Sequence, residues 1–178
     1  PDQPLIAINP VAKWPTKLWP PERFRKLADR LMKCGYQVAF TGSKEDRPFI
    51  DQIAGSLRSP TVRLEGRTSL KVLAAVYRSA GLVVSTDTGP MHLAAAVGTP
   101  VVALFGPTAP WRTGPYGEGH VVLRAGVNCS PCFSKSCKTA EFEPMACMNR
   151  ITVEQVLEAV GGRLHDEQKS RPEQREEP

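Results

Sequence analysis

The 178-residue chain contains no apolar run that approaches the ~20 residues of a membrane-spanning helix. It has no initial methionine, and its first ten residues, PDQPLIAINP, lack the regions that make up a signal peptide. A strand pattern begins almost at once, at residue 5. We therefore expect a piece of a longer chain that does not itself cross a membrane.

Aromatic residues are scarce, at 7% of the chain, and no basic stripe with interleaved aromatics is present. Because such stripes are typical of nucleic-acid-binding surfaces, we expect no nucleic-acid partner. The chain nevertheless carries a net charge of +5 and has a pI near 9.1. This charge suits an anionic small molecule or an acidic membrane surface, and it equally suits an ordinary solvated surface.

The sequence also lacks the G-x-G-x-x-G fingerprint of NAD- and FAD-binding domains. What it does contain is an alternation of short apolar strands and helices. This pattern predicts an α/β fold, a Rossmann-like parallel sheet with helices on both faces. The expected strands are 5–9, 37–42, 61–66, 81–85, 100–106 and 120–124, and the expected helices are 20–35, 44–57, 68–80, 90–98 and 151–162.

Ligands of such sheets bind beyond the carboxyl ends of the strands, which here means the loops after Asn9, Phe40 and Ser85. The third loop opens the stretch STDTGPMHLAAAVG. A helix N-terminus with Thr88 and Gly89 offers amides and a close approach to a phosphate. Asp87 would repel a phosphate and suits sugar hydroxyls better, and His92 lies one turn further on. A plain capped helix with a packed histidine is an equally good interpretation.

Two other loops carry candidate binding residues. Lys13 and Lys17 follow the first strand, where lysine is a suitable point charge for a diphosphate. Trp19, in the same loop, is interpreted as an anchor to the core. Glu45 follows the second strand, where a carboxylate could take a ribose diol or simply remain an exposed acid.

Four of the five cysteines have the spacing C-x2-C-x4-C-x9-C and lie in a loop over 129–148, namely Cys129, Cys132, Cys137 and Cys147. Thiols in this pattern could hold zinc or an iron–sulfur cluster, form disulfides, or remain reduced. The remaining cysteine, Cys34, is expected to be small and buried. Residues 163–178 contain almost no apolar side chains after Leu164, which predicts a disordered charged tail.

Several of these stretches together resemble the glycosyltransferase family 9 heptosyltransferases. They are PTKLWPPERF, TGSKED, LEGRTSLKVLAAVYRSA and DTGPMHLAAAVGTPVVALFGPT, in that order along the chain. The resemblance implies the C-terminal, donor-binding half of a two-domain GT-B enzyme, with this domain over 1–162 and the N-terminal acceptor domain absent. The cysteine loop is similar to that of the second-heptose transferases.

The resemblance also implies a set of residue roles. Lys17 and the amides of Thr88 and Gly89 would hold the diphosphate of ADP-heptose, with Lys13 as an additional phosphate contact. Glu45 would bind the ribose, and Thr68 would lie near the base. Asp87 would bind the sugar hydroxyls, and His92 would support the loop that contains Asp87. Lys13 stands where relatives tend to have a small or hydroxyl residue.

The implied reaction is an inverting transfer of heptose to the lipopolysaccharide inner core, without a required cofactor. The family's catalytic base belongs to the missing domain, so no residue here is assigned that role. The resemblance places the protein in the cytoplasm, with peripheral association at the inner face of the inner membrane. A different nucleotide-activated sugar, or a nucleotide-binding module without catalysis, remains an alternative.

Overall fold

The computed structural model describes residues 3–170 and contains one six-stranded parallel sheet. The strand order is β3-β2-β1-β4-β5-β6, and all five neighbouring pairs are parallel. The strands are β1 (Leu5–Asn9), β2 (Gln37–Phe40), β3 (Val62–Arg63), β4 (Leu82–Thr86), β5 (Val101–Leu104) and β6 (Val121–Leu123). The predicted Rossmann-like sheet is thereby confirmed, although β3 is shorter than expected.

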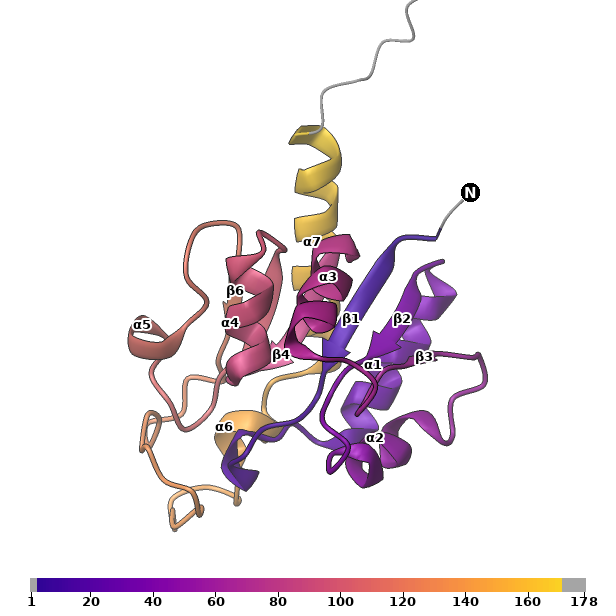
Figure 1. The fold of residues 1–178 in the computed structure, drawn as a ribbon. Coiled ribbons are helices and arrows are strands. Elements are labelled where there is room, and N and C mark those ends of the chain that lie inside the picture. The colour runs from indigo at the N-terminus through magenta and orange to yellow at the C-terminus, as the bar shows by residue number, and fades with distance from the viewer. Residues whose placement is uncertain (1–2, 171–178) are drawn as a thin grey trace, which may run out of the picture.

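Helices cover both faces of the sheet, as predicted (Figure 1). One layer consists of α1 (Pro21–Lys33), α2 (Arg47–Ala54), α6 (Ala146–Asn149) and α7 (Val153–Ser170). Its core includes Ile8, Trp19 and Phe24, all fully buried. The opposite layer consists of α3 (Leu70–Ser79) and α4 (Gly89–Ala96), and its core includes Tyr77 and Ala94. The small side chains of α4 allow this helix to pack closely against the sheet, with Ala94 fully buried.

Local signals set several helix starts. Ser69 caps α3, because its hydroxyl accepts a hydrogen bond from the amide of Val72. Thr152 and Gln155 exchange side-chain and backbone hydrogen bonds of 2.8 and 3.1 Å at the start of α7. Both caps are formed by residue types that favour the starts of helices. Three short helices were not predicted: the 3-10 helix η1 (Pro15–Lys17), α5 (Pro110–Thr113) and α6.

Two expectations need correction. Helix α7 continues to Ser170, so residues 163–170 are helical and not disordered. The stretch is mostly polar, but Leu164 within it is buried against the core and lies beside Gly81. Residues 171–178 lie outside the described part of the chain. Cys34 is exposed at the C-cap of α1 and is not buried. Within residues 3–170, no helix has the length and apolar content to cross a membrane.

Candidate functional site

β1 and β4 are parallel neighbours at the centre of the sheet. After β1 the chain adds strands toward one edge, and after β4 it adds strands toward the other, so the strand order reverses between them. This reversal is where open α/β sheets bind ligands, beyond the carboxyl ends of the strands. The two loops that leave these strands are joined directly, because Thr86 donates a 2.8 Å hydrogen bond to the carbonyl of Val11. The Thr86 hydroxyl is therefore buried and already engaged in a hydrogen bond.

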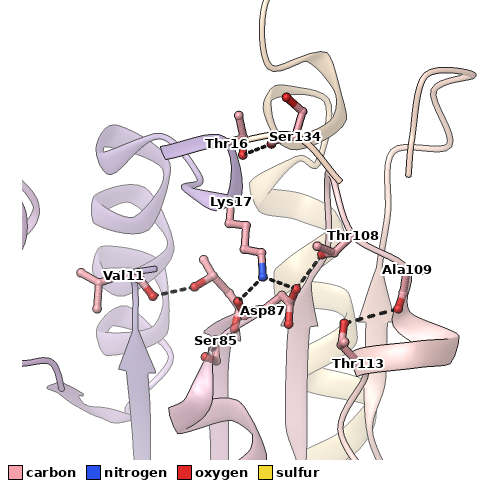
Figure 2. A network of polar contacts seen from close by, with 10 residues as sticks. Val11, Thr16, Lys17, Ser85, Asp87, Thr108, Ala109, Thr113 and Ser134 are labelled. Atoms are coloured by element: carbon pink, nitrogen blue, oxygen red, sulfur yellow. Dashed lines mark hydrogen bonds and ion pairs between the residues drawn. The ribbon is translucent and has the colours of Figure 1, made fainter. Parts of the chain in front are cut away.

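Asp87 follows β4 and forms the centre of a polar network (Figure 2). Its Oδ2 lies 2.6 Å from Nζ of Lys17 and accepts a 2.6 Å hydrogen bond from the hydroxyl of Thr108. Lys17 also donates to the carbonyl oxygen of Asp87 at 3.3 Å. The carboxylate is only 5% exposed and Lys17 16%, so the pair is largely shielded from solvent. The fold therefore brings together Lys17 and Asp87, two of the predicted site residues.

This pairing solves an electrostatic problem that the sequence raised. A carboxylate beside a diphosphate would repel it, but the Lys17 ammonium neutralises Asp87. An ammonium carries three N–H donors, and Lys17 directs two at Asp87. One donor is left for a ligand oxygen. Lys17 also lies 4.7 Å from the ring centre of Trp14, which further fixes its position.

A cavity of about 390 Å³ lies beside this network, at the ends of β1, β2 and β4 and the start of α3. Among the predicted site residues, Lys13, Thr68 and Thr88 line it, and Lys13 is exposed. The other lining residues are Asn9, Val11, Ala12, Gly42, Ser43, Asp46, Ser69, Leu70, Leu73 and Pro90. The cavity thus combines one cation and several hydroxyls with an apolar end at α3.

Buried polar groups fix the base of this cavity. The hydroxyls of Thr41 and Tyr77 lie 2.8 Å apart, and Thr41 donates to Oδ1 of Asn9 at 3.3 Å. All three residues are fully buried. Burial raises the pKa of Tyr77 to about 12, so its hydroxyl stays protonated near neutral pH. Sequence reasoning missed this network, because its members come from three separate elements.

The N-terminus of α4 carries no side-chain cap within the described structure. Thr88 is the N-cap residue, in an extended conformation, and Asp87 is turned toward Lys17 instead. A Cβ added at Gly89 would meet nothing within 4 Å, so packing does not require glycine there. His92 is exposed on α4 and does not line the cavity. The interpretation of this stretch as a capped helix with a core histidine is therefore wrong.

Glu45 is exposed and lies outside the set of residues that line the cavity. Hydrogen bonds from its own backbone amide and from Ser43 lower the pKa of its carboxyl, so it is ionised at neutral pH. Its neighbour Asp46 lines the cavity and accepts a 2.7 Å hydrogen bond from the amide of Ser43. Sequence reasoning missed Asp46, for which the S-x-x-D spacing was an available signal.

The four loop cysteines converge on a second cavity, of about 220 Å³. All five cysteines of the chain are free thiols, so no disulfide forms in this structure. Burial, followed by the proximity of the other three thiols, raises the pKa of Cys147 to about 11. Among residues 3–170, no three His, Cys, Asp or Glu side chains are arranged to hold a metal ion. The four thiols therefore lie around one cavity, with no disulfide between them.

The cysteine loop also contacts the binding loops. The Thr16 hydroxyl, in η1 beside Lys17, donates a 2.7 Å hydrogen bond to the carbonyl of Ser134 (Figure 2). The amide of Phe133 donates a 2.7 Å hydrogen bond to the carbonyl of Pro107, beside Thr108. The loop therefore supports both residues that hold the Asp87 carboxylate.

A parallel sheet of this order, with polar loops at its reversal point, defines a Rossmann-like ligand-binding domain. The family model of glycosyltransferase family 9 (heptosyltransferase) matches residues 1–142, and the chain belongs to this family.

Curated relatives and solved structures agree with this assignment. Lipopolysaccharide heptosyltransferase 1 of Pseudomonas aeruginosa is 38% identical over 138 residues, 77% of this chain and 38% of that protein. Lipooligosaccharide heptosyltransferase 2 of Haemophilus influenzae is 38% identical over 69% of this chain and 37% of its own length. The structure of the Escherichia coli ADP-heptose lps heptosyltransferase II aligns with a TM-score of 0.79 at 30% identity, covering 93% of this chain and 48% of that one. The chain thus spans less than half the length of these relatives.

Proposed function

We propose that this chain is the donor-binding domain of a heptosyltransferase that transfers heptose from ADP-heptose to the lipopolysaccharide inner core with inversion. The observation that carries the proposal is the Lys17–Asp87 pair, placed at the reversal point of the sheet beside an uncapped helix N-terminus. The pair offers a cation to a diphosphate and a carboxylate to a sugar, within one shielded site. The heptosyltransferase names of the relatives support the choice of donor and acceptor.

The diphosphate would lie between Lys17, Lys13 and the first amides of α4. The remaining N–H of Lys17 would donate to one phosphate oxygen. Amides at Thr88 and Gly89 would donate to others, and the open space at Gly89 permits the approach. Lys13, exposed at the cavity wall, supplies the second cation that a doubly charged group favours.

The nucleoside would occupy the cavity of about 390 Å³. Its apolar end, formed by Leu70 and Leu73, offers a surface for the base, with Thr68 as a polar contact. Glu45, ionised at the adjoining loop, would accept hydrogen bonds from the ribose hydroxyls. Asp46 lines the same wall and is the competing candidate for that role.

The sugar would meet the carboxylate of Asp87, whose charge Lys17 balances. His92, exposed one turn into α4, would support this region of the donor. The base that deprotonates the acceptor would belong to the acceptor domain of the whole protein, while the cations named above stabilise the leaving ADP. Peripheral association with the inner membrane is part of the proposal, supported by the net charge of +5 and by Lys26, Arg30 and Lys33, which are exposed on α1.

Calorimetric titration with ADP-heptose, ADP, UDP and GDP tests the proposal. We expect micromolar binding of the two adenine compounds, with the sugar adding affinity that Asp87→Asn removes. Asp29→Asn is the matched control, because this acid pairs with Lys33 on α1, away from the site. A preference for UDP or GDP would retain the binding site and discard heptose. If the chain binds none of them, the titration is repeated with the full-length protein, and absence of binding there rejects the proposal.

A further inference from the structure

Thr108 lies in the loop between β5 and α5 and is 5% exposed. Its hydroxyl donates a 2.6 Å hydrogen bond to Oδ2 of Asp87 (Figure 2). A hydrogen bond this short to an ionised acceptor is of the strong, charge-assisted kind.

The same oxygen of Asp87 also receives Nζ of Lys17 at 2.6 Å. The two donors come from the loops after β1 and β5, the two strands that flank β4 in the sheet. Together they occupy both lone pairs of Oδ2, which fixes the rotation of the carboxylate. Oδ1, the other oxygen, is then the acceptor available to a ligand.

The residues that precede Thr108 are held by the cysteine loop. The Ser130 hydroxyl donates a 2.5 Å hydrogen bond to the carbonyl of Gly106, and the amide of Phe133 donates to that of Pro107. These contacts fix the two residues that precede Thr108. A Cβ at Gly106 would come within 2.5 Å of Met148, so α6 packs directly against this turn. The Thr108 hydroxyl therefore lies on a loop that several contacts hold in place.

We propose that Thr108 is a positioning residue for the sugar of the donor. By holding Oδ2 together with Lys17, it presents Oδ1 of Asp87 to the sugar hydroxyls in one orientation. This inference rests on the proposed function, because it assumes that Asp87 contacts a sugar. It adds that sugar recognition depends on a hydroxyl that does not touch the donor.

Thr108→Val removes the hydroxyl with little change in shape, and Thr108→Ser restores it. Thr113→Val is the control, because this hydroxyl, in the same region, only bonds the carbonyl of Ala109 at 3.4 Å. The measurement is the ratio of the dissociation constants for ADP and ADP-heptose. We expect Thr108→Val to reduce this ratio about tenfold while changing ADP affinity less than about twofold, a factor that corresponds to one charge-assisted hydrogen bond. Thr108→Ser and Thr113→Val should keep the wild-type ratio.

A purely structural role would weaken ADP and ADP-heptose equally, and that result overturns the proposal. An unchanged ratio in Thr108→Val overturns it as well, while the proposed function stands, because the wild type still prefers the sugar. If the wild-type full-length protein gains nothing from the sugar, the proposed function fails and this inference fails with it. In the unliganded protein, the Thr108 hydroxyl proton should be observable by NMR and lost in Asp87→Ala; its absence in the wild type also counts against the proposal.

Discussion

The indole N–H of Trp19 donates a 2.9 Å hydrogen bond to the carbonyl of Ile151, 132 residues further along the chain. Trp19 is fully buried and packs edge-on against Phe24, with ring centres 4.9 Å apart. It thereby anchors the end of the Lys17 loop to the segment that enters α7. The interpretation of Trp19 as an anchor to the core is confirmed.

We expect Trp19→Phe to lower the free energy of unfolding by about 2 kcal/mol, since it loses the hydrogen bond and leaves a cavity. Urea denaturation measures the loss. Trp111→Phe is the control, because Trp111 is 69% exposed and should change stability by less than about 0.5 kcal/mol. Equal effects of the two substitutions would contradict the anchoring role.

Lys17→Met should destabilise the protein by about 3 kcal/mol, because it leaves the shielded Asp87 carboxylate without its cation. Adding Asp87→Asn to this variant should recover part of the loss, since the uncompensated charge is removed. A double-mutant cycle by urea denaturation measures the coupling. Lys33→Met breaks an exposed pair with Asp29 and should have little effect. Additive effects of the two site substitutions would show that the pair is not coupled.

Burial of Tyr77 makes stability fall at high pH. Its pKa rises from 10.0 to about 12 in the folded protein, so the folded state holds the proton more tightly than the unfolded state. The resulting stability is complete below pH 10 and is lost as the pH rises to 12, by about 3 kcal/mol over that window. We expect Tyr77→Phe to flatten this part of the pH profile in thermal or urea unfolding.

Tyr116→Phe is the control substitution, because Tyr116 is 91% exposed and its replacement should change stability little. If the stability of Tyr77→Phe falls between pH 10 and pH 12 as steeply as that of the wild type, the loss comes from other groups.

The cysteines should differ in reactivity. At pH 8, alkylation followed by peptide mass spectrometry should find Cys34, Cys132 and Cys137 modified first, because they are exposed. Cys147 should react far more slowly, since it is buried and a pKa of about 11 leaves only about one thiol in a thousand ionised. A bound metal would instead protect all four loop cysteines and leave Cys34 alone reactive. The experiment thus separates reduced thiols from a metal site, two of the three interpretations that the spacing left open.

Two glycines should respond in opposite directions to alanine. Gly106→Ala places a methyl group against the side chains of Met148 and Cys147, and should cost about 2 kcal/mol of stability. Gly161 lies within α7 with open space around its Cβ position. Gly161→Ala should therefore stabilise the protein by about 0.5–1 kcal/mol. Thermal unfolding of the two variants distinguishes them, and destabilisation by both would contradict the geometry at Gly161.

The alternation of strands and helices, the parallel sheet and the polar loops are predictable from the sequence alone, and the caps at Ser69 and Thr152 are formed by residue types that favour helix starts. These follow from side-chain periodicity and from hydrogen bonds over three residues, so a local stretch of sequence contains them. The short helices η1, α5 and α6 and the extension of α7 were not predicted. Leu164 explains the last case, because its burial depends on a surface that local composition does not describe.

The contacts of the polar residues, by contrast, could be learned only from the three-dimensional structure. Asp87 looked free to cap α4 or to meet a sugar, and the fold brought Lys17 and Thr108 to its carboxylate from 70 and 21 residues away. Glu45 and Asp46 are neighbours in sequence, yet only Asp46 lines the cavity. The order of the strands sets such placements, because it determines which loop ends meet at the reversal between β1 and β4.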